Sequence, residues 1–365
     1  MLSLRKFDLM KKLLFALPLL GLLWSGCSND FEVTAPWKEV PVVYAILSAK
    51  DTANYVRVEK AFLDPDESAL VVAQIADSLY YPADAITVFM EHVKTKVKVQ
   101  LTRVDGNLDG HPRQPGTFAT TPNWLYKLKS PNGAKLIAGD KYRLIVVRAD
   151  GKKDITSVTT VPNEFVFNTP NPADIPPKIT FQTDKTASLR WLGDTSSVLF
   201  DVDMVVRYRV EAGNGTTLLN RSIKWSVAKN LQRGAFPIST TQGPFYTTNY
   251  EVSGNRFFEL VANQIKADDL AGIDTISNER FRYFEGIDLV INGGGSEIYQ
   301  YLQTVSANSG LTGSEIISSY TNISEGYGVF TAKNTSTLSN LKVTELTINS
   351  MNTNPLTKAL NFKFF

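Results

Sequence analysis

Apolar and polar side chains alternate in short runs along most of this chain, a pattern typical of strands that bury one face. In the first half, polar segments rich in Gly, Asp and Asn separate the runs. Strands are predicted there at 42–47, 55–58, 86–93, 97–103, 124–128, 142–147 and 155–161. We expect 86–93 and 97–103 to form one hairpin. The runs 142–147 and 155–161 should form another, because Asp150-Gly151 between them is a strong turn signal.

The second half continues the pattern with two longer apolar periods close to helical spacing. Strands are predicted there at 179–181, 187–191, 200–210 and 280–291, and helices at 255–265 and 296–305. In the first half, one helix is predicted at 68–76. Ser68 and Ser296 stand where an N-cap is needed. Strands without regularly alternating helices predict a mainly β chain built from antiparallel β-sandwiches, the second with short helical insertions.

A Pro-rich segment divides the pattern into two parts. Residues 168–177 hold four prolines, which stiffen a chain and cannot donate to a β-ladder. We therefore expect an N-terminal β domain at 38–167, a linker at 168–177 and a C-terminal β domain at 178–365.

Two local patterns resemble known β modules. The predicted hairpin that opens with 138–144 is similar to immunoglobulin-like and transthyretin-like modules. In the second domain, Trp191 ends one strand and a long alternating strand with Tyr208 follows, which resembles a fibronectin type III module. Both resemblances imply a fold and no activity.

The composition of the 365 residues narrows the classes further. At 43% hydrophobic and 20% charged residues the chain is globular, and a net charge of +2 is too small to predict a nucleic-acid partner. One Cys excludes an intrachain disulfide, a Cys-rich zinc site and an iron–sulfur cluster.

The first residues predict export. A basic segment is followed by an apolar run at 13–24, too short to span a hydrocarbon core about 30 Å thick and typical of a signal peptide. The run ends in Leu23-Trp24-Ser25-Gly26-Cys27, which resembles a bacterial lipobox. The resemblance implies removal of residues 1–26 and lipidation of the Cys27 thiol. A conventional secretory signal is the alternative.

The tether at 27–37 contains Asp30 and Glu32, which resemble the acidic surface-export tether of Bacteroidota lipoproteins. The stretches 37–47, 55–62 and 320–330 resemble uncharacterised lipoproteins of the same group. These resemblances imply an outer-membrane protein, lipid-anchored and displayed at the cell surface, with a periplasm-facing anchor as the alternative. They imply no reaction.

One loop resembles a calcium site. Asp105, Asn107 and Asp109 place three oxygen side chains at alternate positions and Gly110 permits a sharp turn, as in an EF-hand loop. The twelfth position is Gly116, where that pattern needs a bidentate Glu. The sequence therefore favours a polar turn. We expect no cofactor, with Ca²⁺ at these residues as the alternative.

Two adjacent aromatic pairs are the candidates for ligand binding. Tyr80-Tyr81 and Phe245-Tyr246 fall in predicted loops, where exposed rings could stack on a sugar or a peptide. The sequence favours core or rim packing for any one aromatic ring of the chain, and these adjacent pairs in loops are the best candidates for exposure.

No motif predicts catalysis. His92 falls in a predicted strand and His111 in a loop, and no Ser-centred elbow accompanies them. We expect a non-enzymatic protein that binds a ligand or partner, such as a surface glycan or peptide, as an accessory to a TonB-dependent transporter. The alternatives are an adhesion or envelope-assembly lipoprotein, and a hydrolase whose carboxylates converge only in the fold.

Overall fold

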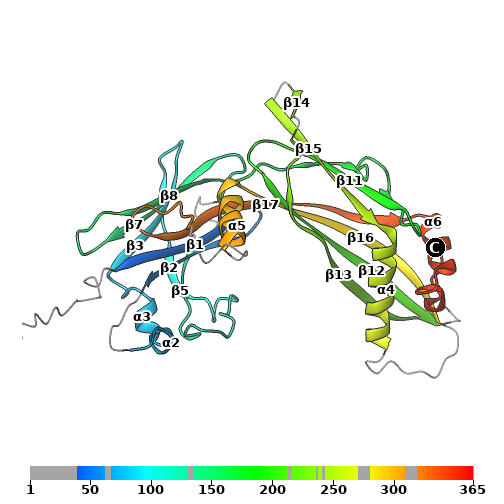
Figure 1. Cartoon of the computed structure of the whole chain (residues 1–365), viewed down its shortest axis with the longest axis horizontal. Helices are drawn as coiled ribbons and strands as arrows, with labels where there is room; N and C mark the ends of the chain where they lie inside the picture. Colours follow the sequence, from blue (N-terminus) through cyan, green and yellow to red (C-terminus); the bar gives the residue numbers. More distant parts are fainter. Residues whose placement is uncertain are drawn as a thin grey trace, which may run out of the picture. The chain divides into compact units, whose positions relative to one another are not determined.

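β-Strands dominate the described chain (Figure 1). The computed structural model describes residues 39–61, 67–129, 135–212, 215–235, 237–240, 243–269, 280–308 and 319–364. The predicted signal peptide, Cys27 and most of the tether lie outside these ranges. Glu39–Phe365 forms one compact unit. Within the described ranges, no helix is long and apolar enough to cross a membrane.

The largest of the three sheets in these ranges has nine strands. In spatial order eight of them are β13 (Thr217–Gln232), β12 (Leu199–Ala212), β16 (Arg280–Gly294), β17 (Tyr327–Val343), β1 (Val40–Ser48), β2 (Ala53–Ala61), β6 (Trp124–Lys129) and β5 (Thr102–Asp105). The ninth, β10 (Lys178–Ile179), pairs with β17. All neighbours are antiparallel except β1 and β10, which both run parallel to β17.

Two four-stranded antiparallel sheets accompany the large sheet. One has the order β4 (Lys98–Gln100), β3 (Ile86–His92), β7 (Lys141–Arg148) and β8 (Ile155–Thr160). The other has the order β14 (Pro237–Thr240), β15 (Gly243–Ser253), β11 (Thr186–Gly193) and β9 (Val166–Thr169).

Short helices connect and cover these sheets. They are α2 (Ala69–Val72), α3 (Ala76–Leu79), α4 (Gly254–Asp269), α5 (Ser296–Asn308), α6 (Glu345–Thr353) and a 3₁₀ turn at Lys358–Leu360. Helix α4 packs on β13 and β15 (Figure 1), and its Phe257, Phe258 and Val261 are fully buried.

The described residues form two large cores, each with the layers of a β-sandwich. In the first core, Val43 and Leu47 of β1 pack with Val88 of β3 and Leu144 of β7, so the large sheet faces the β4–β8 sheet. In the second core, side chains of β12, β13 and β16 pack with Leu189 and Trp191 of β11. Alternating burial along the strands gives each sheet one apolar face, which confirms the predicted mainly β class.

Strand β17 contributes to both cores. Its first residues pair with β1, Tyr327 with Val42 through Lys333 with Ser48, and its later residues pair with β16. A β-carbon at Gly328 would lie 1.9 Å from the carbonyl oxygen of Val43, so this close approach requires glycine. Because Phe330 and Ala332 join the first core, that core uses chain well beyond residues 168–177. The division into domains and their likeness to named modules stay predictions.

Two predicted elements were wrong in detail. The helix expected at 68–76 is two single turns, α2 and α3, and Ser68 makes no side-chain capping bond. The strand expected at 97–103 divides at buried Leu101: β4 pairs with β3, whereas β5 pairs with β6 in the large sheet. Leu101 between the two strands joins the first core, whereas the residues of β4 and β5 themselves are half-buried or exposed.

Candidate functional site

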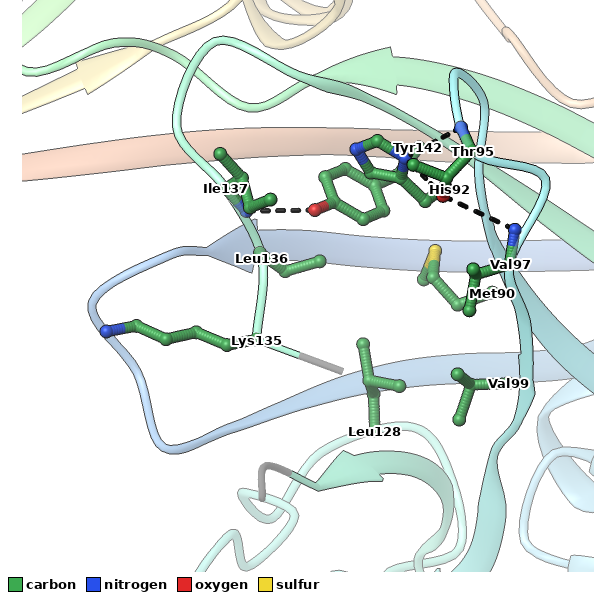
Figure 2. A pocket seen from close by; sticks show the side chains of 10 residues that line it. All are labelled: Met90, His92, Thr95, Val97, Val99, Leu128, Lys135, Leu136, Ile137 and Tyr142. Carbon is green, nitrogen blue, oxygen red and sulfur yellow. Dashed lines mark hydrogen bonds between the residues drawn. The ribbon is translucent and has the colours of Figure 1, made fainter. Parts of the chain in front are cut away.

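A cavity of about 230 Å³ opens at one end of the first sandwich, and we call it the apolar pocket (Figure 2). Its walls come from β3, β4, β6, β7 and the segment before β7. The lining residues are Met90, His92, Thr95, Val97, Val99, Leu128, Lys135, Leu136, Ile137 and Tyr142. Val97 and Ile137 are each 55% exposed, so apolar surface continues from the pocket to the protein exterior.

The polar wall of the apolar pocket is built on the β3–β4 turn. The backbone amide of Thr95 donates to Nδ1 of His92 (3.1 Å), and the Thr95 hydroxyl lies 2.8 Å from the same nitrogen. Lys96 takes a positive φ of 62° to close the turn. Since Nδ1 accepts, the neutral ring carries its proton on Nε2, which donates to Oδ2 of Asp140 at 2.8 Å.

His92 therefore has a structural role. Its Nδ1 atom is bonded to Thr95 and its Nε2 atom to Asp140. The ring packs edge-on against Tyr142, with centroids 5.1 Å apart; Figure 2 shows Thr95, His92 and Tyr142 together. The Tyr142 hydroxyl accepts a hydrogen bond from the backbone amide of Ile137, and burial raises the pKa of this phenol. The pocket therefore offers an apolar floor and fixed polar walls, an arrangement suited to holding an apolar group.

The predicted calcium loop is held by protein groups. Oδ1 of Asp105 accepts from the amides of Asn107 and Asn123, both at 3.0 Å. The Asn107 side chain bonds the backbone of Thr120 and Arg113. These contacts fix the turn, as the favoured polar-turn interpretation expects.

The Asp109 backbone amide bonds the carbonyls of Asp105 and Gly106 within the turn, but its side chain points to other partners. It pairs with Nζ of Lys127 (2.6 Å) and accepts from the Tyr55 hydroxyl (2.9 Å); these two hydrogen bonds lower the pKa of the Asp109 carboxyl. Among the described residues no three His, Cys, Asp or Glu side chains gather as a metal site. Calcium binding stays a prediction.

The expected exposure of Tyr80 and Tyr81 is wrong. They retain 4% and 5% of their surface, because neighbouring residues in extended chain point to opposite sides and both sides are covered here. The Tyr80 hydroxyl accepts from Arg113 (2.8 Å), whereas Tyr81 packs in the first core. Burial and the nearby Glu39 carboxylate raise the pKa of Tyr81.

Phe245 and Tyr246 are half-buried on β15, in the sheet that covers the second core. The guanidinium of Arg233 lies 3.8 Å from the centre of the Tyr246 ring, so a cation already covers one ring face. The two predicted aromatic pairs therefore lie in different parts of the fold, Tyr80 and Tyr81 between α3 and β3 and Phe245 and Tyr246 on β15, and do not form one platform. A ligand-binding role stays a prediction for each.

The sequence alone did not predict that the residues of the apolar pocket form a site. Leu128, Met90 and Leu136 read as ordinary core positions, and only the fold brings their strands together. The one local signal was His92 at a strand end, three residues before Thr95 and beside the apolar Val97. The described lining contains no carboxylate pair. The hydrolase alternative stays untested.

Comparisons with known proteins place most of the chain in one family. Residues 38–339 match the family described as "Domain of unknown function (DUF4249)". No curated protein matches the chain. Among solved structures, it is similar to the C-terminal globular domain of an oligosaccharyltransferase from Pyrococcus abyssi, with 11% identity and a TM-score of 0.24. That match covers 68% of this chain and 41% of the other.

Proposed function

This chain belongs to the DUF4249 family, and we propose that it is a non-enzymatic, lipid-anchored protein of the outer-membrane surface that binds a ligand or partner. The family carries no assigned reaction, so the proposal rests on this chain's own residues. The observation that carries it is the apolar pocket, whose fixed polar wall and exposed apolar rim suit binding.

The anchor is the first part of the proposal. It is supported by the apolar run at 13–24, which ends where the chain's single Cys follows Ser25 and Gly26. A diacylglyceryl group on Cys27, joined by an acyl chain on its new amine, would hold the protein firmly at a membrane. Asp30 and Glu32 support display on the outer surface.

Binding at the apolar pocket is the second part. A volume of about 230 Å³ fits an apolar or aromatic side chain better than a whole drug-sized ligand. We infer that the pocket takes one apolar side chain of an extended peptide, while the exposed Val97 and Ile137 contact its neighbours. A glycan ligand would instead need stacking rings, for which Phe245 and Tyr246 are the half-buried candidates.

Accessory service to a TonB-dependent transporter is the context we favour. An adhesion or envelope-assembly role is the second candidate, and it would use the same exposed apolar rim. Affinity capture of the lipidated protein from membranes separates them, because the accessory role expects an outer-membrane barrel to copurify. Capture without a barrel would contradict that role.

The anchor is tested by feeding cells radiolabelled palmitate. We expect label on the wild-type chain and none on the Cys27→Ser variant. We also expect protease added to whole cells to degrade the wild-type protein at the surface and to leave the variant intact. Unlabelled wild-type protein would overturn the anchor, and labelled protein resistant to protease would overturn surface display.

The binding role is tested with a tethered-peptide library screened on the purified protein. We expect selected peptides to share one large apolar residue, and Val97→Asp to reduce their binding by about tenfold. Val158→Asp is the matched control, because Val158 is also exposed, at 40%, but does not line the pocket. Equal losses in both variants would contradict the assignment.

A further inference from the structure

A second cavity, of about 410 Å³, lies where β10, β12, β16 and β17 meet α6 and the last residues of the described chain. Its floor is apolar: Phe284 and Val343 are 8% exposed and Ile348 is 3% exposed. The remaining lining residues are Pro176, Lys178, Arg209, Glu285, Lys342, Lys363 and Phe364. We call it the basic pocket, because four of them are cations.

Two carboxylates, Glu285 of the lining and the adjacent Glu211, compensate Arg209, whereas the three lysines of this described lining have no such pairing. Glu285 accepts a hydrogen bond from Arg209, which also bonds Glu211 at 2.5 Å. The Lys342 ammonium donates to the backbone carbonyl of Glu285, a group without net charge. Lys178 and Lys363 have no carboxylate within ion-pair distance among the described residues. The pocket thus carries excess positive charge.

Strand pairing also places two positively charged residues next to each other. Lys178 and Lys342 are register partners on the parallel strands β10 and β17, and both line the same cavity. Like charges brought close together repel one another. An anion between the two ammonium groups would reduce that repulsion, so this pair of lysines favours binding of negative charge.

We propose that the basic pocket binds an amphipathic organic anion, a carboxylate or phosphate joined to an apolar body. The anionic group lies between Lys178 and Lys342, with Lys363 and Arg209 nearby, and the apolar body packs on Phe284, Val343 and Ile348. The volume falls within the range of small-ligand pockets, about 300–1,000 Å³. This site is separate from the apolar pocket and from the anchor, so it stands or falls independently of the proposed function.

Calorimetric titration of the purified protein with four probes tests the site. Octanoate and octyl phosphate carry both features, octyl glucoside lacks the charge, and inorganic phosphate lacks the apolar body. We expect at least one octyl anion to bind about tenfold or more tightly than the last two probes, and to weaken at high salt. Tighter binding of octanoate indicates a carboxylate ligand, and tighter binding of octyl phosphate a phosphate or lipid headgroup.

The double variant Lys178→Gln/Lys342→Gln should weaken the preferred anion by about tenfold or more. Lys185→Gln is the matched control, an exposed lysine outside the pocket, and should bind as the wild type does. Equal binding of all three octyl probes, no binding of either octyl anion, or insensitivity to salt would overturn the proposal. If the double variant fails to fold, the salt dependence of anion binding to the wild-type protein still tests the proposal.

Discussion

Nε2 of His92 lies 2.8 Å from Oδ2 of Asp140, and this hydrogen bond joins the end of β3 to the turn before β7. Nδ1 of the same ring meanwhile accepts from Thr95 in the β3–β4 turn. One imidazole therefore ties together two of the loops that form the wall of the apolar pocket.

Replacing this histidine should loosen the pocket and the sandwich end together. We expect His92→Ala to lower the free energy of unfolding by about 1–3 kcal/mol, because it removes hydrogen bonds to Thr95 and Asp140 and the ring contact with Tyr142. Urea unfolding measures the change. Lys135→Ala, also in the lining but exposed, should cost below about 0.5 kcal/mol. Equal midpoints for both variants would show that His92 does not hold the turn.

The buried carboxylate of Glu59 should matter far more than an exposed one. Its Oε1 atom accepts from Arg113 at 2.6 Å and from Arg57 at 3.0 Å, and its side chain is 11% exposed. Glu59→Gln leaves two guanidinium groups without a counter-charge, so we expect a loss of about 3 kcal/mol or more in unfolding free energy.

Glu164→Gln is the comparison for Glu59, because Glu164 pairs with Lys50 while 62% of its side chain is exposed. That loss should stay below about 1 kcal/mol. Similar losses in the two variants would refute the distinction between buried and exposed pairs.

Glu297 should make stability depend on pH. Burial raises the pKa of this carboxyl on α5, although its own amide and the hydroxyls of Thr159 and Thr331 act in the opposite direction. The folded state therefore favours the protonated form. Stability is full below the ordinary pKa of glutamate and falls as pH rises through the raised folded value.

Glu297→Gln should consequently raise the melting temperature near pH 7, by about 2 °C, with the gain vanishing near pH 4. Melting curves across this range measure the difference. Glu325→Gln, at an exposed pair with Lys153, should show no such pH-dependent gain. A constant difference at all pH values would rule out titration of Glu297 as the cause.

A fragment of residues 39–167 should not fold alone, although the Pro-rich segment predicts a boundary beside it. The fragment lacks β17, so β1 loses its parallel partner and the first core loses Phe330 and Ala332. We expect a low, noncooperative unfolding signal by circular dichroism. A peptide of residues 319–343 added in trans should restore cooperativity. Cooperative unfolding without the peptide would support the predicted boundary instead.

The spacing of apolar residues was sufficient to predict elements that bury one continuous apolar face. The alternation at 200–210 predicts β12, and the apolar spacing at 255–265 predicts α4. Strand β13 gives no such signal over its first residues, because Thr217 and Leu218 are both exposed and regular burial begins only at Ile223. Its position depends on pairing with β12.

Pairing between distant segments is what the sequence could not reveal. Val42 and Tyr327 are register partners, yet neither neighbourhood contains a motif that selects the other. The same limit applies to the sites. Lys178 and Lys342 become neighbours only through β10 and β17, and adjacent tyrosines at 80 and 81 look exposed until the fold covers both sides of that segment.

The pairing of β1 with β17 also limits the order in which strands can pair during synthesis. Strand β1, the first of the described chain, cannot pair with β17 until synthesis has reached residues 327–343. Contacts so distant in sequence form slowly, because a long loop must close before they are made. The N-terminal segment therefore has an unpaired strand edge before β17 is available, and holdase chaperones that cover such edges should speed its productive folding.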